Sequence, residues 1–398
     1  MSVRPSILMV TGEYPPGIGG VGDYTARLSA HLVGMGARVV VLAGGPDAPG
    51  TAPPDSGRVQ VVRGAGRWSF RSWHRVASVV AEVGADVIHI QYQAAAYGMH
   101  PAANLLPAYL RVRRPHLKVA TTFHDLRVPY LFRGAGKLRR EAVRALDRFS
   151  HVSVVTNQAD MEDLGGPGDG TQNRRRRWLI PIGSNIDNSP PPGYRRDEWR
   201  RRLGADEETL VISYFGLMNH SKGVDLLVDA VGLLADRGVR LKLLIVGGEA
   251  GESDPTNRRY QDEVLRSVET PRLRDRVFRT GFVPDQQVSA YLLASDLCAL
   301  PFRDGASLRR GSLLAAIVHG LPVVTTVPSQ PESLLVDGEN VVLVERGNPE
   351  ALAVAIERLW HYGAVRHRVS RGAEEMAKRF GWPAIAARHM EMYRALLG

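Results

Sequence analysis

Short apolar runs alternate along the chain with longer segments whose apolar residues recur at helical spacing. This alternation is typical of an α/β fold, in which helices connect the buried strands of parallel sheets. In the first half, the pattern predicts strands at Ser6–Thr11, Arg38–Leu42, Val59–Arg63, Val87–Gln91, Lys118–Phe123, Val152–Thr156 and Trp178–Pro181. The helices predicted there are Gly22–Met35, Trp73–Val83, Ala102–Arg113, Gly134–Arg148 and Ala159–Leu164.

A proline-rich segment, Gly183–Arg196, interrupts this series. Pro190–Pro192 can join neither a helix nor a sheet ladder, so the segment marks the best domain boundary. A second series follows, with strands predicted at Leu210–Phe215, Lys242–Gly247, Val277–Thr280, Leu297–Pro301, Pro322–Thr325 and Val341–Val344. Its helices are predicted at Val224–Asp236, Arg258–Val268, Asp285–Ala294, Ser312–His319, Pro349–Trp360, Val365–Ala377 and Trp382–Leu397.

The length of the chain agrees with this division. At 398 residues it is too long for one ordinary core. We therefore predict two Rossmann-like domains, at 1–183 and 197–381, with a linker at 184–196 and flexible insertions at 45–57 and 165–177. Two such domains facing each other would leave a deep cleft where the carboxyl ends of their strands meet, and ligands bind at such places.

Composition narrows the class of protein. Apolar residues make up 44% of the chain and charged residues 23%, as in soluble globular proteins. No stretch approaches the roughly 20 apolar residues that cross a bilayer, and the N-terminus lacks a signal-peptide pattern. Cys298 is the only cysteine, which excludes an internal disulfide and a cysteine-based metal cluster. These features predict a cytoplasmic location.

The net charge of +10 indicates an acidic partner, such as nucleotide phosphates, nucleic acid or anionic lipid. Nucleic acid is the weakest of these, because no recognisable module appears and the aromatic residues do not interleave with the basic runs. The chain also has only five lysines among its 51 basic residues. Part of the charge therefore reflects a general preference for arginine.

One stretch combines features of an anion site. Asp304–Thr326 begins as a loop carrying Arg309 and Arg310, continues as a helix from Ser312 and ends in a buried strand. Unpaired backbone N–H groups and the helix dipole favour phosphate at such a helix start. An ordinary loop with solvated arginines explains this stretch equally well when it is taken alone.

A glycine-rich loop follows the first predicted strand. Gly17–Gly22 matches the dinucleotide-binding pattern G-x-G-x-x-G, but its glycines come several residues after the strand. The second strand also lacks an acidic residue at its end to hold a ribose. A nicotinamide or flavin site is therefore not expected. The glycines would let a ligand approach the backbone closely, or they would simply serve a tight turn.

Taken in order, these pieces resemble the family-4 glycosyltransferases, retaining enzymes of the GT-B fold. The resemblance covers nearly the whole chain, and it depends on the order and spacing of short motifs. The first-domain motifs are Glu13–Thr25, Asp86–His89 and Thr121–Leu126. The second-domain motifs are Phe215–Asp225, Leu244–Gly248, Thr280–Val283, Ala294–Asp296 and Gly320–Val324. Phe380–Tyr393 is similar to the last helix of the fold, so residues 382–398 are expected to complete the first domain.

The resemblance implies transfer of a hexose from a UDP- or GDP-linked donor to a hydroxyl acceptor, without a metal or other cofactor. The acceptor would be a glycan, a lipid-linked molecule or a small molecule, and it would bind the first domain.

Negative charge builds on the departing diphosphate, so the reaction needs a cationic clamp. The residues implied for catalysis are His124, Lys222 and Arg309. Those implied for the donor are Gly216, Lys222, Gly281, Phe282 and Ser307, Leu308, Arg309, Arg310, Gly311, Ser312. Those implied for the acceptor are Gly19, Gly20, Asp23, Tyr24, His89 and Gln91.

Each of these assignments has a plainer alternative. Lys222 would otherwise be a surface lysine on a loop, and His124 a structural hydrogen-bonding residue at the end of a strand. The chain also departs from the family pattern. Most members carry two glutamates in the donor stretch, where this chain has Ser307 and Ala315, and Leu217 replaces a frequent arginine. The alternative hypothesis is therefore a catalytically silent GT-B protein that acts as a partner or regulator.

Much of the positive charge falls in the first half of the chain and in the linker. The basic segments are Arg111–Lys118, Lys137–Arg144, Arg174–Arg177 and Arg195–Arg202. Related enzymes with lipid-linked acceptors often dock on anionic membranes through such a basic face. The sequence therefore predicts weak, salt-sensitive binding at the inner face of a membrane, with solvated arginines as the alternative.

Overall fold

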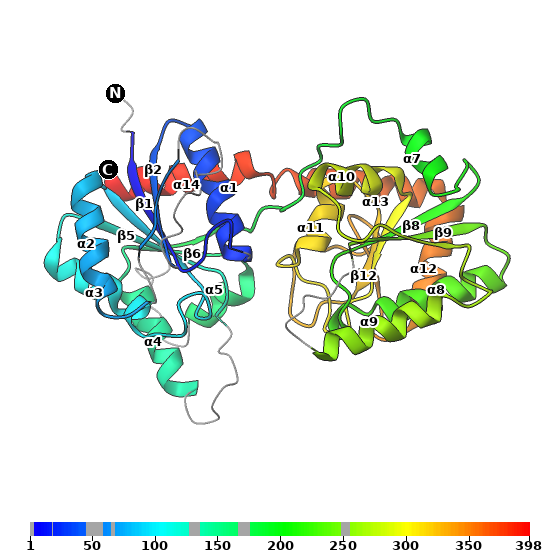
Figure 1. The fold of residues 1–398 in the computed structure, drawn as a ribbon, viewed down its shortest axis with the longest axis horizontal. Helices are drawn as coiled ribbons and strands as arrows, with labels where there is room; N and C mark the ends of the chain where they lie inside the picture. Colours follow the sequence, from blue (N-terminus) through cyan, green and yellow to red (C-terminus); the bar gives the residue numbers. More distant parts are fainter. Residues whose placement is uncertain are drawn as a thin grey trace. The chain divides into compact units, whose positions relative to one another are not determined.

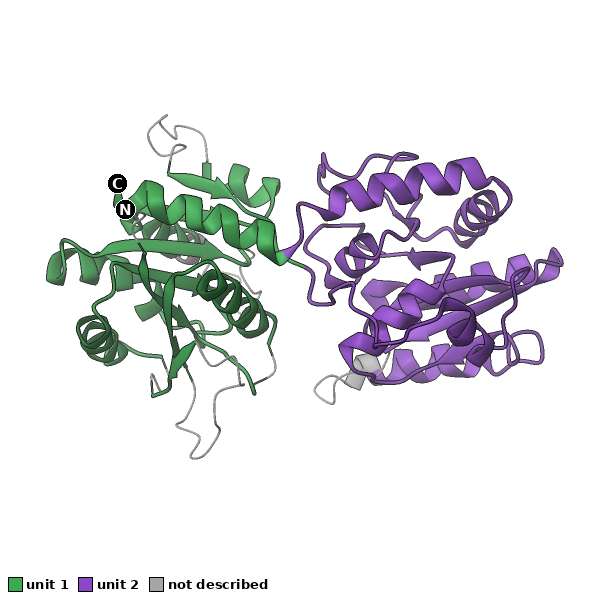
Figure 2. Cartoon of the chain, turned by 90° about the horizontal axis from the view of Figure 1, so that it is seen from above, with its two compact units in different colours: residues 1–183, 382–398 green, residues 184–381 purple. Residues whose placement is uncertain are grey.

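The computed structural model describes residues 4–17, 19–44, 59–64, 68–126, 136–165, 176–247 and 255–398. The predicted insertion 45–57 and most of the predicted insertion 165–177 lie outside these ranges. The chain divides into two compact units, shown in Figure 2. Unit 1 contains Met1–Gly183 and Trp382–Gly398, and unit 2 contains Ser184–Gly381. Their relative positions are not determined, so each unit is described by itself.

Unit 1 is built on a parallel seven-stranded sheet with the order β3-β2-β1-β4-β5-β6-β7 (Figure 1). Its strands are β1 (Ser6–Thr11), β2 (Arg38–Ala43), β3 (Gln60–Val62), β4 (Val87–Tyr92), β5 (Lys118–Phe123), β6 (Val152–Val155) and β7 (Arg177–Leu179). Its helices are α1 (Gly20–Gly34), α2 (Ser72–Val83), α3 (Ala102–Arg113), α4 (Gly136–Phe149), α5 (Gln158–Gly165) and α14 (Trp382–Leu397). The central strands β1 and β4 are buried along almost their whole length, as expected where helices cover both faces of a parallel sheet.

The last helix, α14, belongs to unit 1 although it follows unit 2 in the chain. Trp382 and Tyr393 are buried in the same apolar cluster as Tyr24 and Leu28 of α1. Gly183, the last residue before unit 2, lies against the Trp382 ring. A Cβ atom at this position would come within 2.7 Å of the indole. Only glycine allows this contact between the two ends of the unit.

Unit 2 repeats the same plan with a parallel six-stranded sheet of order β10-β9-β8-β11-β12-β13. Its strands are β8 (Leu210–Phe215), β9 (Leu241–Val246), β10 (Val277–Arg279), β11 (Leu297–Leu300), β12 (Val323–Thr326) and β13 (Val342–Val344). Its helical segments are α7 (Arg196–Arg202), η1 (His220–Lys222), α8 (Val224–Asp236), α9 (Pro255–Val268), α10 (Asp285–Ala294), α11 (Gly311–Val318), α12 (Pro349–His361) and α13 (Gly363–Ala377).

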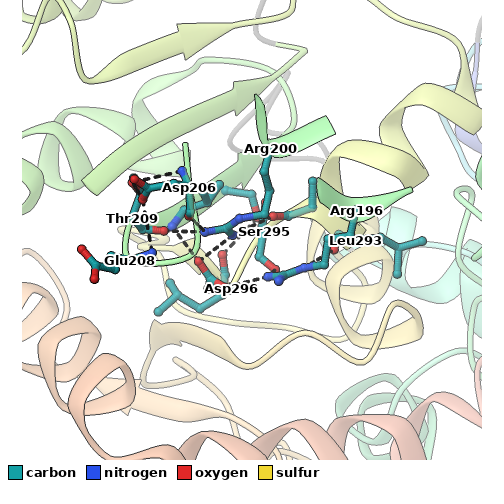
Figure 3. Close-up of polar contacts among 12 residues, drawn as sticks. Arg196, Arg200, Asp206, Glu208, Thr209, Leu293, Ser295 and Asp296 are labelled. Carbon is teal, nitrogen blue, oxygen red and sulfur yellow. Dashed lines mark hydrogen bonds and ion pairs between the residues drawn. The ribbon is translucent and has the colours of Figure 1, made fainter. Parts of the chain in front are cut away.

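The α/β prediction with parallel sheets is confirmed, and the predicted strands and helices occur with bounds shifted by a few residues at most. Helix α7 was not predicted. It has few apolar residues, and a buried arginine secures it (Figure 3). The Arg200 side chain donates to the backbone oxygens of Ala294, Asp206 and Thr209 and to Asp296 Oδ2, at 2.6–3.2 Å.

Asp296 connects this arginine to the sheet. Its Oδ2 atom also accepts from the backbone N–H of Val211 in β8 at 2.8 Å, and its Oδ1 accepts from Arg196 at 2.6 Å. Arg196 donates further to the backbone oxygens of Leu293 and Ser295. The network therefore fastens α7 to the amino ends of β8 and β11, away from the carboxyl ends where ligands bind in this topology.

Candidate functional site

The strand order of the second sheet predicts a ligand site at the carboxyl ends of β8 and β11. From β8 the chain continues to β9 on one side of it and later returns to β11 on the other side, so the strand order reverses between β8 and β11. The backbone N–H of Arg303, after β11, donates to the oxygen of Ser221, after β8, at 3.0 Å. These two loops therefore lie in contact.

Lys222 belongs to the loop after β8, where its backbone is held in a defined conformation. The Asn219 side chain caps the short η1 segment by accepting from the Lys222 backbone N–H at 3.2 Å. Gly223 then adopts φ 67°, and a Cβ atom there would collide with the backbone oxygen of Pro301. Glycine is therefore required where the chain turns from Lys222 into α8.

Two cations share one aromatic ring at this site. The Lys222 ammonium lies 5.2 Å from the centroid of the Phe302 ring, and the Arg310 guanidinium lies 4.2 Å from it. Burial, and then the nearby charge of Arg310, lower the pKa of Lys222 to about 8. Arg310 forms an ion pair with Asp304. Within the described ranges, the Lys222 ammonium has no ion pair or hydrogen bond of its own.

The start of α11 adds donors beside these cations. Ser312 is only 7% exposed, yet its hydroxyl has no hydrogen-bond partner within the described chain, and neither does Arg310 Nε. A Cβ atom built on Gly216, directly after β8, would lie 3.7 Å from the Ser312 Cβ. Gly216, Ser312, Lys222 and Arg310 are thus gathered around one place. An unsatisfied buried donor is costly, which favours an anionic oxygen at this point.

The turn before α11 is held by hydrogen bonds to the Glu332 carboxylate. Ser307 Oγ donates to Glu332 Oε1 at 3.1 Å, and the backbone N–H of Leu308 lies 3.4 Å from the same oxygen. Leu308 is buried, while the side chains of Arg309 and Arg310 are half-buried. Neither Glu332 nor Phe302 was predicted from the sequence. An aromatic residue directly after the Leu297–Pro301 run was a usable signal for Phe302, but no local pattern indicates Glu332.

Phe282 lies at the ends of β9 and β10. Gly281 pairs with Gly247 in an isolated bridge, and the next residue, Phe282, is 89% exposed. Leu217, which follows Gly216, is 55% exposed. Exposed apolar side chains of this size next to a polar site are suited to stacking on a ligand.

In unit 1, the glycine loop encloses a carboxylate of the protein itself. Glu13 Oε1 accepts from the backbone N–H groups of Val21 at 2.9 Å and Gly22 at 3.3 Å, both in the first turn of α1. A Cβ atom on Gly19 would collide with the same carboxylate. The glycines therefore let the loop fold over Glu13, and two amides of this helix start are already occupied.

His124 follows β5 and is nearly buried. Its Nε2 atom lies 2.9 Å from Gln91 Oε1 at the end of the neighbouring strand β4. A carbonyl oxygen can only accept, so Nε2 carries the proton and Nδ1 keeps the lone pair. Burial, and then the charge of His389, lower the pKa of His124 to about 3, so the ring is neutral at ordinary pH. The Tyr24 ring packs edge-on against it, with centroids 4.7 Å apart.

His89 lies deeper and is fully buried. Its ring nitrogens have Tyr393 and Thr122 as hydrogen-bond partners. Tyr24 is also buried, with His389 Nε2 3.5 Å from its hydroxyl. Of the residues predicted for the acceptor, His89, Gln91 and Tyr24 therefore line the interior of unit 1. Gly19, Gly20 and Asp23 lie at the surface of its glycine loop.

No group of three His, Cys, Asp or Glu side chains among the described residues is placed to hold a metal ion. No helix in the same part of the chain has the length and apolar character needed to cross a bilayer.

Comparisons with known proteins identify the family. Residues 18–165 match the family described as Glycosyltransferase Family 4, and residues 209–361 match Glycosyl transferases group 1. The chain belongs to the family-4 glycosyltransferases. It is 30% identical over 260 residues to D-inositol 3-phosphate glycosyltransferase of Corynebacterium glutamicum, a match covering 64% of this chain and 60% of that protein. The chain thus spans about three fifths of the curated relatives it matches.

Solved structures show the fold. Sucrose-phosphate synthase from Thermosynechococcus elongatus is similar with a TM-score of 0.71 and 21% identity, covering 99% of both chains. HepE from Anabaena, solved in complex with UDP, is similar with a TM-score of 0.71 and 18% identity, covering 98% of this chain and 100% of that one. The predicted GT-B fold is therefore confirmed.

Proposed function

We propose that this family-4 member transfers a sugar from a nucleotide-diphosphate sugar to a hydroxyl acceptor, with retention at the anomeric carbon. The main support is the cationic end of the second sheet, where Lys222 and Arg310 share the Phe302 ring beside the unpartnered hydroxyl of Ser312. Negative charge grows on the diphosphate as its bond to the sugar breaks. Fixed cations and donors at that place stabilise the transition state more than the ground state.

In this proposal the loops of unit 2 bind the donor. Lys222 and Arg310 contact the diphosphate, together with Arg309 and the first amides of α11, at Gly311 and Ser312. Gly216 gives the phosphates access to these groups because a side chain there would approach Ser312. Ser307 and Leu308 shape the turn that carries the arginines.

Phe282 is proposed to stack on the nucleobase, next to the Gly281 backbone. Its 89% exposure leaves the ring face available, and stacking on an aromatic ring does not require a particular base. This arrangement is compatible with either a UDP- or a GDP-linked donor.

His124 is proposed to hold a hydroxyl of the reacting sugar. Because its ring stays neutral and Nε2 donates to Gln91, Nδ1 accepts a hydrogen bond from such a hydroxyl. Gly19, Gly20 and Asp23 are proposed to contact the acceptor, with Tyr24, His89 and Gln91 supporting them from the interior. The curated relatives are named for a transfer involving D-inositol 3-phosphate, and from them we take the reaction class.

A second hypothesis is a catalytically silent protein, favoured by the absence of a carboxylate at Ser307 and Ala315. One experiment separates the two. The full chain is incubated with UDP-, GDP-, dTDP- and ADP-sugars, and mass spectrometry follows release of the nucleoside diphosphate. Slow release of the nucleoside diphosphate from one donor, together with binding of that same nucleoside diphosphate in calorimetry, supports the transferase. Absence of both release and affinity across the panel would reject it.

We also propose weak association with anionic membrane surfaces. The last turn of α3 carries Arg111 and Arg113, and Val112 between them is 82% exposed. An apolar side chain framed by arginines suits the boundary between lipid headgroups and acyl chains. The side chains of residues 137–139 and the whole of residues 174–175, in the other predicted basic segments of unit 1, lie outside what the structure describes.

A further inference from the structure

The donor turn 307–310 carries a cationic site without a carboxylate in its own sequence. Arg309 and Arg310 are adjacent, and the charge of Arg310 reaches Lys222. Cations placed this close repel one another, so they stay together only where the backbone that carries them is held. The structure therefore has to supply a restraint from outside the turn.

That restraint comes from Glu332, in the segment after β12. One carboxylate oxygen accepts from Ser307 Oγ at 3.1 Å and faces the Leu308 amide at 3.4 Å. Ser307 Oγ in turn lies 3.4 Å from the amide nitrogen of Arg309. A single carboxylate thus connects to three successive residues of the turn. Hydrogen bonds to an ionised acceptor are the stronger kind.

The same two segments are in contact at a second place. Ala306 donates from its backbone N–H to the oxygen of Thr326 at 3.3 Å. Gly305 adopts φ 92°, and a Cβ atom there would lie 2.6 Å from the Ser329 backbone nitrogen. The backbones around Gly305 and Ser329 are therefore packed without room for a side chain. This contact brings the segment that bears Glu332 against the donor turn.

The turn also sets the start of α11. The backbone N–H of Arg310 donates to the oxygen of Ser307 at 3.0 Å, and the oxygen of Arg310 accepts from Leu313 and Leu314 at 3.0–3.1 Å. Because these hydrogen bonds connect Ser307 to the first turn of α11, a shift of Ser307 also moves the amides of Gly311 and Ser312. Glu332 can therefore influence the phosphate donors without touching the ligand.

We propose that Glu332 is a positioning residue of the donor site: through Ser307 and Leu308 it holds the turn that presents Arg309, Arg310 and the α11 amides to the diphosphate. This inference rests on the proposed nucleotide-sugar function. It assigns Glu332 no contact with the sugar or the nucleobase.

The test measures nucleotide binding by the full chain, which needs no knowledge of the acceptor. The best-binding nucleoside diphosphate among UDP, GDP, dTDP and ADP is compared with its nucleoside by calorimetry. Glu332→Ala is expected to weaken diphosphate binding about ten- to a hundredfold and to leave nucleoside binding unchanged. Glu332→Gln keeps a carbonyl acceptor and should stay within a few fold of the wild type. Glu339→Ala removes an exposed carboxylate from the same region and serves as the control.

Whether diphosphate binding becomes weaker or tighter distinguishes a positioning role of Glu332 from a purely electrostatic effect of its charge. Removing a negative charge near a cationic site would by itself tighten diphosphate binding, in the Gln variant as much as in the Ala variant. Unchanged or tighter binding by Glu332→Ala would overturn the proposal. An equal loss of diphosphate and nucleoside binding would overturn it too, because that pattern indicates general misfolding.

Hydrogen exchange keeps this inference distinguishable from the proposed function. If the wild type binds no nucleotide, the proposed function fails, and exchange at residues 305–314 still reports on Glu332. Faster exchange there in Glu332→Ala, with the rest of unit 2 unchanged, supports the restraint. Unchanged exchange in that segment contradicts it.

Discussion

Unit 2 contains two groups of buried or half-buried cations, at opposite ends of its sheet. At the amino ends, Arg200 is 5% exposed and donates to three backbone oxygens and to Asp296. At the carboxyl ends, Lys222 and Arg310 face the same aromatic ring, and Ser312 beside them lacks a partner in the described chain. Both groups hold charge out of water. In the second group Arg310 pairs with Asp304, but its Nε atom and the Ser312 hydroxyl have no hydrogen-bond partner in the described chain.

The difference shows how the same residue types serve stability in one place and binding in the other. A buried cation whose donors are all paired becomes a structural fastener, and its loss leaves its partners unpaired. A cation held beside unsatisfied donors is in a less favourable state, and an anionic ligand relieves this. Both groups are cationic. What distinguishes the proposed donor site from the Arg200 network is therefore the presence of polar groups without hydrogen-bond partners.

The largest effect is expected from breaking the satisfied group. Arg200→Ala leaves Asp296 with only the half-exposed Arg196 as a cation, and it leaves the backbone oxygens of Ala294, Asp206 and Thr209 without this donor. We expect a loss of about 3–5 kcal/mol in the unfolding free energy of unit 2, measured by urea denaturation. Arg201→Ala, in the same helix but with a mostly exposed side chain, should change stability by about 0.5 kcal/mol or less. Similar small losses in both variants would show that the Arg200 network contributes little.

Breaking the unsatisfied group should act on turnover instead. Lys222→Ala is expected to lower donor hydrolysis or transfer about a hundred- to a thousandfold, because one arm of the diphosphate clamp is lost. Its thermal stability should equal or exceed that of the wild type, since a partly desolvated charge beside Arg310 is removed. Lys378→Ala, at an exposed ion pair, is the matched control. A large loss of stability in Lys222→Ala would show that the lysine stabilises the fold, as Arg200 is expected to do.

How much of this could be predicted depends on the range of the interactions. The buried strands were predicted because each apolar run is local and needs no knowledge of its neighbours. Helix α7 was missed because Arg200 bonds to Ala294 and Asp296, more than ninety positions away. Lys222, Arg309 and Arg310 were predicted as donor-site residues from local motifs. Glu332 was not, since its partners Ser307 and Leu308 are distant in sequence and no periodicity connects them.

The comparison also predicts a dependence on pH. Burial and the charge of Arg310 place the pKa of Lys222 near 8 in the free protein, and an anionic diphosphate should raise that pKa. Above pH 8, binding therefore requires proton uptake, and affinity should fall by up to tenfold per pH unit. Calorimetry at pH 8.5 in two buffers of different ionisation enthalpy measures the uptake. Lys222→Ala should abolish it, and an equal uptake in that variant would point to another group.

The smallest effect is expected from a third kind of cation, the exposed arginines at the end of α3. Arg113 and Arg114 lie exposed at the surface beside Val112. Water solvates their charges, so burial does not strengthen their attraction to an anion. Their contribution to binding is limited to attraction at a distance, about 1 kcal/mol per residue at an anionic surface. Val112→Asp should therefore reduce flotation with vesicles containing phosphatidylserine at low salt by a few fold, and donor turnover should not change. Val354→Asp, at an exposed valine of unit 2, is the control. If both variants float like the wild type, α3 does not dock on membranes, and the charge of unit 1 reflects the preference of the chain for arginine.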